Sequence, residues 1–264
     1  MSKVSICVPT YEFNGRGAFY LQRLLDSLVI QTYKNFEVVI SDQSCDNQIF
    51  NLLSWNTHDL QIKYFRCDKL PDGNMSYNTN SAIKRATGDI IKPLFQDDLL
   101  NSPRVIERLM SEFDNPDTNW VGLKYIAMYD EGVEPRWKNC QDPFFHPETL
   151  YGHNKMSSPS AVAFRNTEDN VFDENVTMMM DCDFYHRMNQ KYGLPRIVVD
   201  DLYVGIGQNN DQYQKNMDLN EKIALEFVYL FQKHGIVSLD MEKTSSPWKP
   251  QMQRAFDMIK DGEK

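Results

Sequence analysis

Short runs of apolar and β-branched residues alternate with amphipathic segments over the first 115 residues, and this alternation limits the possible folds more than any other feature. The strand-like runs lie at residues 4–8, where Pro9 stops the run, and at 36–42, 62–66 and 90–95. Helices are predicted at 18–31, at 46–54, before Gly88 and within 101–113. Strands that alternate with helices in this way form a mostly parallel sheet that carries helices on both faces.

The second half of the chain is less regular. The elements predicted there are a strand at 120–129, a long loop at 130–156, a short strand at 160–165, a helix that ends at Gly193, a late pair of strands at 196–207 and a helix at 217–234. The remaining tail is polar, with a possible short final helix. We therefore predict an α/β domain at 1–210, with halves at 1–115 and 116–210, followed by a C-terminal helical extension at 211–264.

Polar residues mark the carboxyl ends of three predicted strands. Pro9 and Thr10 follow the first strand, Asp42 ends the second, and the adjacent pair Asp97 and Asp98 follows the fourth. Ligands of open parallel sheets bind beyond the carboxyl ends of the strands. The sequence therefore predicts a binding site at this edge of the sheet.

Composition excludes several classes of protein. The chain has 264 residues and a net charge of −9, which argues against broad binding to nucleic acid or to anionic membranes. No apolar run approaches the roughly 20 residues of a membrane span, so any membrane contact would be peripheral. The opening "MSKVSICVPT" has no signal-peptide core and is interpreted as a first strand. Five cysteines without CxxC spacing favour a cytoplasmic location over a disulfide framework.

Four segments carry a resemblance to a known family. They are "VSICVPTYE", "FEVVISDQSCDN", "GNMSYNTNSAIKRATGDIIKPLFQDD" and "FRNTEDNVFDENVTMMMDCDFYHRM", in this order along the chain. Over about residues 1–210 the chain resembles a family 2 glycosyltransferase of the GT-A fold. The resemblance implies an inverting transferase that moves a sugar from a nucleotide-diphosphate donor to a saccharide or other hydroxyl acceptor, in glycan or surface polysaccharide synthesis. Residues 1–115 would then bind the nucleotide sugar, and 116–210 the acceptor.

The same resemblance implies roles for individual residues. The residues expected to contact the donor nucleotide are Pro9, Thr10, Tyr11, Glu12, Asp42, Asn80 and Asp97. Asp98 would bind Mn²⁺ or Mg²⁺, and Asp181 would be the catalytic base. The chemistry agrees, because a departing diphosphate gains negative charge and hard cations prefer carboxylate oxygens. Two alternatives stay open: the Asp97–Asp98 pair as a solvated turn or helix N-cap, and Asp42 as a turn cap in "SDQS".

The sequence departs from the family pattern at three single positions and in one longer stretch. Phe95 stands where a D-x-D-D motif has its first aspartate, Thr79 replaces an arginine before Asn80, and Met180 replaces the first acid of "EDxDLxxR". In "GIGQNNDQ", residues 205–212, amides replace a histidine that often helps to hold the metal or the diphosphate. Amide oxygens are weaker ligands, so we expect weak metal binding without nucleotide, unless this stretch is an ordinary turn.

The acceptor half has its own candidates. Asp181 could also cap its helix, and Asp183 could pair with Arg187 at i,i+4 instead of contacting an acceptor. Aromatic residues of the long loop could form an acceptor platform or could simply pack the loop; they are Trp137, Phe144, Phe145 and Tyr151. We expect residues 130–156 to govern acceptor choice.

Two other functions share this kind of sheet. A sugar nucleotidyltransferase would carry a glycine-rich basic loop such as GxGxRxxP after the first strand, whereas this chain has only Gly15, Arg16 and Gly17 there. A catalytically inactive nucleotide-sugar-binding module would keep the fold but lose the base. Retention of Asp98 and Asp181 favours the transferase.

Overall fold

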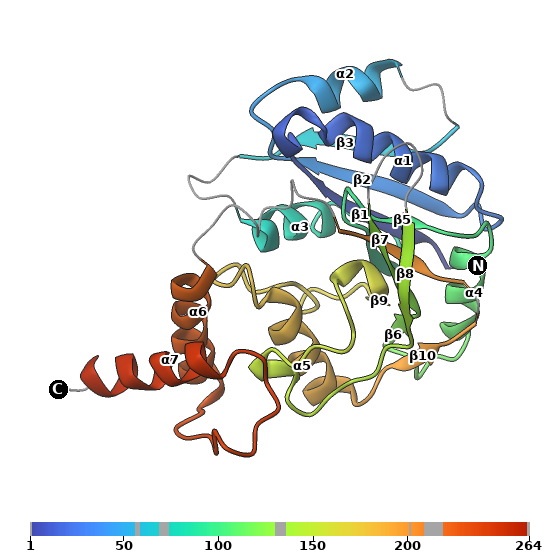
Figure 1. The fold of residues 1–264 in the computed structure, drawn as a ribbon. Helices are drawn as coiled ribbons and strands as arrows, with labels where there is room; N and C mark the ends of the chain where they lie inside the picture. The colour runs from blue at the N-terminus through green and yellow to red at the C-terminus, as the bar shows by residue number, and fades with distance from the viewer. Residues whose placement is uncertain are drawn as a thin grey trace.

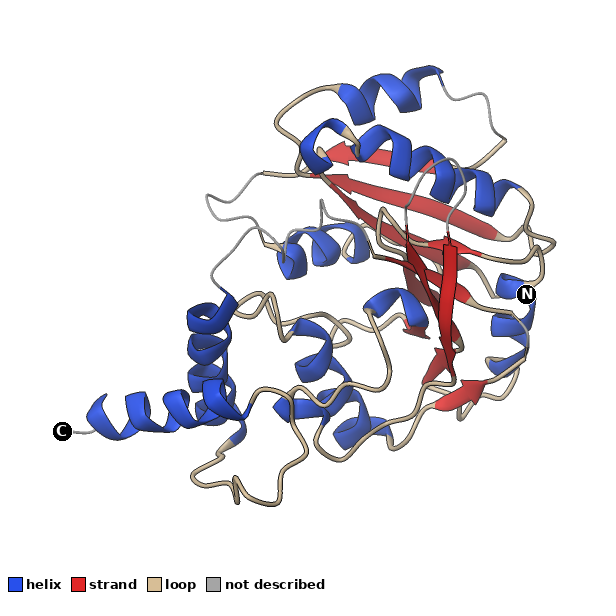
Figure 2. Cartoon of the chain, in the orientation of Figure 1, coloured by secondary structure: helices blue, strands red, loops and turns tan. Residues whose placement is uncertain are grey.

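The computed structural model describes residues 2–55, 59–68, 74–129, 136–200, 202–208 and 219–262 as two β-sheets flanked by helices (Figures 1 and 2). The strands are β1 Val4–Thr10, β2 Phe36–Asp42, β3 Ile62–Arg66, β4 Ile90–Pro93, β5 Leu99–Leu100, β6 Trp120–Leu123, β7 Tyr125–Tyr129, β8 Arg136–Gln141, β9 Val162–Arg165, β10 Arg196–Val198 and β11 Val204–Gly207. The α-helices are α1 Gly17–Val29, α2 Gln48–Trp55, α3 Met75–Ile83, α4 Val105–Glu112, α5 Met180–Tyr192, α6 Leu219–His234 and α7 Lys249–Gly262. Three short 3₁₀ helices are η1 Phe13–Gly15, η2 Thr149–Tyr151 and η3 Pro159–Ala161.

The larger sheet has seven strands in the order β10-β6-β9-β4-β1-β2-β3. Its strands run parallel except β9, which is antiparallel to both β4 and β6. Thr10 lies opposite Asp42 in the ladder between β1 and β2. This register brings the polar ends of these two strands to one edge of the sheet, as the sequence predicts.

Strand β1 continues two residues beyond its predicted end, through Pro9 to Thr10. Its ladder with β4 reaches only as far as Cys7, so Pro9 lies where that side of β1 is no longer paired. Proline has no N–H to donate and is tolerated at such a place.

Both faces of the larger sheet are buried. Val4, Ile6 and Val8 of β1 belong to one core cluster with the leucines of α1 and the apolar residues of α4. Cys7 lies in a second cluster, with aromatic residues of α5, α6 and α7. Successive side chains of a strand point to opposite faces, so the unbroken apolar run at residues 6–8 supplies both clusters. The predicted class, a mostly parallel sheet with helices on both faces, is confirmed.

The smaller sheet, β5-β11-β7-β8, corrects two expectations. The predicted strand at 120–129 is two strands, because β6 belongs to the larger sheet and β7 to the smaller one. Lys124 lies between them, where its backbone bonds to Val198 on one side and Val204 on the other. The predicted pair at 196–207 divides likewise into β10 and β11. Hydrophobic periodicity marks an extended chain but does not show that the chain passes from one sheet to the next.

The predicted loop at 130–156 also needs correction. Residues 136–141 form β8, which pairs antiparallel with β7, and η2 lies further on. Residues 130–135 lie outside the described part of the chain. The sequence of β8, "RWKNCQ", has no apolar alternation because residues 137–141 are exposed on an edge strand. Its pattern therefore could not indicate a strand.

The C-terminal helices form the expected extension. Ile223, Phe227 and Leu230 of α6 are buried, and α7 packs on α6 with the rings of Phe231 and Phe256 4.6 Å apart. Figure 1 shows α7 reaching away from the sheets. Among the described residues, none of the helices combines the length and the apolar character needed to cross a bilayer. The boundary at 210 remains a prediction.

Candidate functional site

Asp42 is fully buried at the end of β2, and several donors surround its carboxylate. Ser44 donates both its backbone N–H and its hydroxyl to Oδ1, at 2.9 and 2.5 Å. The Tyr64 hydroxyl donates to Oδ2 at 2.8 Å, and the Arg66 guanidinium lies 3.6 Å from the same oxygen. The turn-capping alternative is therefore confirmed, and contact with a nucleotide remains a proposal for Asp42.

The loop after β1 is held by Gln96, a residue that the sequence analysis did not select. The Tyr11 N–H donates to Gln96 Oε1 at 2.9 Å, and Gln96 Nε2 donates to the carbonyl of Gly17 at 2.7 Å. A Cβ at Gly17 would lie 2.3 Å from the Tyr11 carbonyl, so only glycine fits this close approach. Glu12 accepts the Cys45 N–H at 3.2 Å. The motif "FQDD" thus joins the loop at 10–17 to the two aspartates.

Asp97 and Asp98 lie in a tight turn between β4 and β5, in which the Asp98 N–H donates to the Phe95 carbonyl. Their exposed fractions are only 6% and 3%, so the pair is neither a solvated turn nor a helix cap. Asp98 Oδ1 accepts the Gly207 N–H at 2.7 Å. A Cβ at Gly207 would lie 2.6 Å from Asp97 Oδ2. Glycine at the end of β11 therefore lets both carboxylates approach the backbone.

Burial, followed by the neighbouring Asp97 carboxylate, raises the pKa of Asp98 to about 8. Hydrogen bonds from the Ser160 hydroxyl and the Gly207 N–H oppose this rise, as does the charge of Lys92. Two adjacent carboxylates repel each other when both are ionised. A hard divalent cation would neutralise both charges, so it suits this pair. The donor set of this site therefore fits Mg²⁺ or Mn²⁺.

Lys92 is a second residue that the sequence analysis did not select. It is completely buried in β4, and its ammonium donates to the carbonyls of Pro93, at 2.9 Å, and of Ser160. Burial lowers the pKa of Lys92 to about 7, and the charge of Asp98 opposes this shift. The only signal in the sequence is a lysine inside the otherwise apolar strand "IIKPLF".

Asp181 is the second residue of α5, and the expectation that it caps the helix is wrong. The N-cap is Met179, and no side chain caps it. Glu226 of α6 instead accepts the backbone N–H groups of Thr177, Met178 and Met179 just before the helix. Within the first turn of α5, Asp181 accepts the N–H of Cys182 through Oδ1.

The surroundings of Asp181 suit a base. Its Oδ1 accepts the Cys182 N–H and its Oδ2 accepts Asn154 Nδ2, both at 2.7 Å. Asp181 is partly exposed to solvent as a whole residue, but its carboxylate is closely surrounded by protein atoms. This burial raises the pKa of Asp181 to about 6 against the effect of the hydrogen bonds. A carboxylate with such a pKa is ionised at neutral pH and is a stronger base than an exposed aspartate.

The structure places two other candidates in structural roles. Asn80 is 1% exposed, and its amide bonds to the backbone N–H and carbonyl of Phe172 and to the Glu174 carboxylate, so it joins α3 to the segment before α5. Asp183 is fully buried and bonds to Arg187, Lys233 and His234 at 2.7–2.9 Å. The expected pairing of Asp183 with Arg187 is confirmed. We assign neither Asn80 nor Asp183 to the proposed site.

Replacing Asp183 with alanine should lower the free energy of unfolding by about 3 kcal/mol, because it leaves the cations Arg187 and Lys233, and the ring nitrogen of His234, without their common partner. This is the low end of the range for breaking a buried ion pair, since Arg187 and Lys233 keep access to water. Urea denaturation would measure the loss. Asp169→Ala is the control, because Asp169 forms an exposed pair with Lys191. Equal stability of the two variants would contradict the assigned role.

The pH dependence of this effect has a definite sign. Burial alone would raise the pKa of Asp183, but the hydrogen bond from His234 and the charges of Arg187 and Lys233 hold it well below its ordinary value. The stabilisation is therefore complete above the unfolded-state pKa near 3.8 and is lost as the pH falls toward the folded-state pKa.

The aromatic residues of 136–156 do not form one platform. Phe145 packs edge-on against Trp120, and Tyr151 against Phe231, so the packing alternative is confirmed for these two. Trp137 is 42% exposed on β8, and its indole lies over Gly205 of β11. Because Gly205 and Gly207 are two residues apart on one strand, Trp137 and Asp97 approach the same face of β11. Trp137 therefore remains a candidate for acceptor contact.

The amides predicted to replace a metal-binding histidine fall largely outside the described residues. Gln208 is described, and its N–H donates to the Met128 carbonyl. Asn209 and Asn210 lie outside the described part of the chain.

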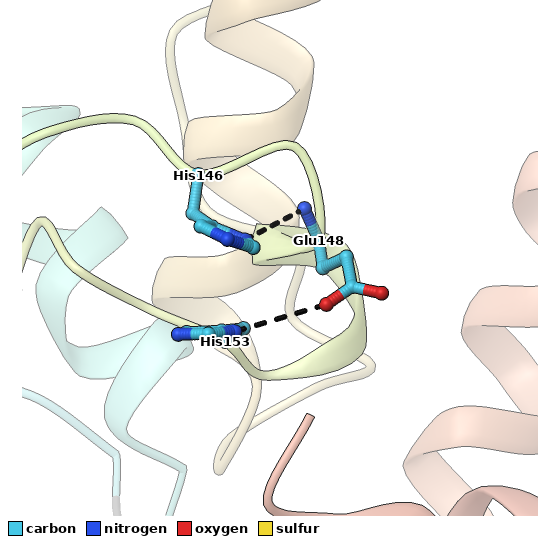
Figure 3. Close-up of side chains that lie close together, drawn as sticks. All are labelled: His146, Glu148 and His153. Carbon is cyan, nitrogen blue, oxygen red and sulfur yellow. Dashed lines mark hydrogen bonds and ion pairs between the residues drawn. The ribbon is translucent and has the colours of Figure 1, made fainter. Parts of the chain in front are cut away.

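Figure 3 shows a separate polar cluster of His146, Glu148 and His153, which come together although the sequence has no HxxxH pair. The two imidazole rings stack with centroids 3.9 Å apart. His146 Nδ1 accepts the Glu148 N–H, His153 Nδ1 lies 2.5 Å from the Ser245 hydroxyl, and the Ser245 N–H donates to Glu148. These atoms already have protein partners, so we interpret the cluster as a clamp that joins residues 146–153 to the segment before α7.

Comparison with known proteins agrees with the family resemblance of the sequence and with the fold. Residues 5–180 match the family model described as glycosyl transferase family 2. An uncharacterized glycosyltransferase of Rickettsia felis is 34% identical over 158 residues, which are 58% of this chain and 23% of that protein. The chain thus spans about a quarter of the length of this relative.

Two solved structures share the fold. The crystal structure of S. aureus TarS 1–349 with UDP-GlcNAc has a TM-score of 0.63 and 18% identity, over 97% of this chain and 71% of that one. The mannosyltransferase PcManGT from Pyrobaculum calidifontis, with GDP-Man and Mn²⁺, has a TM-score of 0.60 and 17% identity, over 97% and 69%. These likenesses confirm the predicted GT-A fold.

Proposed function

The chain belongs to glycosyl transferase family 2, and we propose that it transfers a sugar from a nucleotide-diphosphate donor to a saccharide or other hydroxyl acceptor with inversion at the anomeric carbon. One observation carries the proposal: a buried aspartate pair follows β4, and a carboxylate whose pKa is raised to about 6 begins α5. The first group suits the charged end of a donor, and the second suits the removal of a proton from an acceptor.

The donor half of the proposal concerns the edge formed by β1, β2 and β4. Pro9, Thr10, Tyr11, Glu12 and Asp42 would contact the nucleoside, and Asp97 would accept hydrogen bonds from the ribose. Asp98 would hold Mn²⁺ or Mg²⁺, which when bound would neutralise charge on the leaving diphosphate. The UDP-GlcNAc in TarS, and the GDP-Man and Mn²⁺ in PcManGT, support a nucleotide-sugar donor and a divalent metal for this fold.

The acceptor half of the proposal concerns Asp181. Its carboxylate would accept the proton of the acceptor hydroxyl while that oxygen attacks the anomeric carbon on the face opposite the diphosphate. A single displacement of this kind inverts the configuration of the sugar. The hydrogen bonds from Asn154 and Cys182 would keep the carboxylate oriented during the transfer. We place the activity in glycan or surface polysaccharide synthesis and, from the cysteine usage, in the cytoplasm.

A panel of nucleotide sugars with Mn²⁺ tests the proposed function. Release of nucleoside diphosphate together with a product heavier by one sugar residue supports the transferase. A nucleotidyltransferase would instead exchange pyrophosphate with a nucleoside triphosphate. Nucleotide-sugar binding without turnover, across the acceptors tried, would favour an inactive binding module.

Replacing Trp137 with alanine should raise the Michaelis constant for the acceptor about five- to tenfold and leave that for the donor unchanged. The reason is the exposed indole beside Gly205, because stacking on an aromatic ring contributes about 1 kcal/mol. Steady-state kinetics with each substrate varied in turn would measure both constants. Trp55→Ala is the control, since Trp55 is an exposed tryptophan on α2. A change confined to donor affinity would refute the acceptor role.

A further inference from the structure

One short segment contacts both proposed catalytic carboxylates. Asn154 begins the segment, and its Nδ2 donates to Asp181 Oδ2 at 2.7 Å. Ser160 ends it, and its hydroxyl hydrogen-bonds to Asp98. A segment of seven residues, 154–160, thus connects the proposed base with the aspartate pair that follows β4.

The amide of Asn154 has a defined orientation. Its Oδ1 accepts the Met156 N–H at 2.8 Å, so its NH₂ group must face the other way. That group donates both to Asp181 and to the Ser157 carbonyl, the latter at 2.9 Å. The Tyr185 hydroxyl donates to the same carbonyl at 3.1 Å. A flipped amide would place an oxygen against the carboxylate, so the hydrogen bonds exclude it.

The other end of the segment is equally constrained. The Ser160 hydroxyl accepts the Phe95 N–H at 2.7 Å, and the ammonium of Lys92 bonds to the Ser160 carbonyl. Ser158 caps η3 by accepting the Ser160 N–H. Ser160 is completely buried. The segment therefore cannot shift without breaking contacts to β4.

We infer that Asn154 is a positioning residue for Asp181: the turn at 154–157 aims its amide N–H at the carboxylate, and the segment 154–160 aligns that carboxylate with Asp98. The inference rests on the proposed role of Asp181 as the base. A donor to the ionised form of an acid favours that form, so Asn154 also helps to keep Asp181 ready to accept a proton.

The other titratable groups near Asp181 do not compete with this effect. Cys182 of α5 hydrogen-bonds to Asp181, and the charge of Asp181 also reaches Tyr185 of the same helix. Burial raises the pKa of both Cys182 and Tyr185 well above the ordinary value. They therefore stay neutral over the range in which Asp181 titrates. The negative charges of Asp183 and Glu226, like that of Asp181, raise the pKa of Cys182 further.

Elements beyond α5 bring a few further groups. The charge of Tyr125, in β7, contributes to the raised pKa of Tyr185. On the segment side, Asn154 is flanked by His153, whose ring meets the Ser245 hydroxyl, and by Lys155. Burial, together with the charges of His146 and Lys155, lowers the pKa of His153 below its ordinary value. His153→Ala is therefore included to separate the titration of this imidazole from that of Asp181.

Two substitutions of Asn154 should shift the titration of Asp181 by different amounts. Asn154→Ala removes the donor and should raise the midpoint by about one pH unit, the worth of a typical hydrogen bond to a charged group. Asn154→Asp keeps the shape and the acceptor for the Met156 N–H but puts a second carboxylate against Asp181, so it should raise the midpoint further. Asn170→Ala is the matched control, because Asn170 is a buried amide that donates to the Arg165 carbonyl.

The experiment is a carbon-13 NMR titration of aspartate side chains in the full chain, with Asp181→Asn to assign the resonance. We expect an upward shift of the Asp181 midpoint in both Asn154 variants, no shift in Asn170→Ala or His153→Ala, and the same upward shift in the acid limb of the pH–rate profile. An unchanged midpoint in the folded Asn154→Asp protein would overturn the inference. A shifted midpoint with full activity of Asp181→Asn would uphold the contact while refuting the proposed base.

Discussion

Replacing Asp98 with alanine should abolish sugar transfer, with a loss of about a thousandfold or more. Asp98 is the proposed metal ligand, and loss of charge stabilisation at a leaving group has effects of this size. The fold should survive the change. Burial and the Asp97 carboxylate raise the pKa of Asp98 to about 8, so ionising this side chain costs free energy in the protein alone. Thermal unfolding of the variant should therefore stay close to that of the wild type.

The metal role has two further measurements. Excess EDTA should stop the wild-type enzyme, and added Mn²⁺ should restore it. Calorimetric titration with Mn²⁺ should show weak binding to the protein alone and tighter binding with a nucleoside diphosphate, because phosphate oxygens would complete the coordination. Asp59→Ala, at an exposed position, should behave as the wild type. Full activity of Asp98→Ala, or of the wild type in EDTA, would rule the role out. Equal Mn²⁺ affinity with and without diphosphate would show that the protein alone completes the site.

Replacing Asp181 with asparagine should slow the chemical step about 10²- to 10⁴-fold, the usual contribution of a general base. Asparagine has nearly the same shape and can still accept the Cys182 N–H, so nucleotide binding should not change. Single-turnover kinetics would report the chemical step, and calorimetry with nucleoside diphosphate would report binding. Loss of binding in parallel with loss of rate would point to misfolding instead of a missing base.

The pH dependence of the wild type provides a second check on Asp181. Burial raises its pKa to about 6, and the base must be ionised to accept a proton. Activity should therefore rise with pH through about 6 and level off above about 7. The residual activity of Asp181→Asn should lack this limb. NMR of the product should show the anomeric configuration opposite to that of the donor, and retention would refute the single displacement.

Much of the fold follows from local patterns. The runs at 4–8 and 36–42 became β1 and β2, because strands buried on both faces carry nearly continuous apolar residues. The run at 62–66 became β3, an edge strand whose apolar and aromatic residues are half-buried. The strand β8 was missed because it lies on an exposed edge, and the passage between sheets at Lys124 has no local signature. Part of the site could also be predicted from the sequence, because parallel strands bring their carboxyl ends to one edge of the sheet. Thr10 and Asp42 were predicted to lie together on this ground, and the structure pairs them.

The sequence by itself determined the α/β class, the resemblance to the family, and the placing of the aspartate pair at the end of β4, because each depends on residues close together in the chain. Tertiary structure alone decided what neighbouring polar residues do. Asp181 and Asp183 are two residues apart in α5, yet Asp181 meets Asn154, whereas Asp183 meets Arg187, Lys233 and His234. Successive helical positions point in different directions, and what each one meets depends on segments far away in the sequence. For the same reason Lys92, Gln96 and Asn154 acquired their roles only when β4, the loop after β1 and the segment 154–160 were packed together.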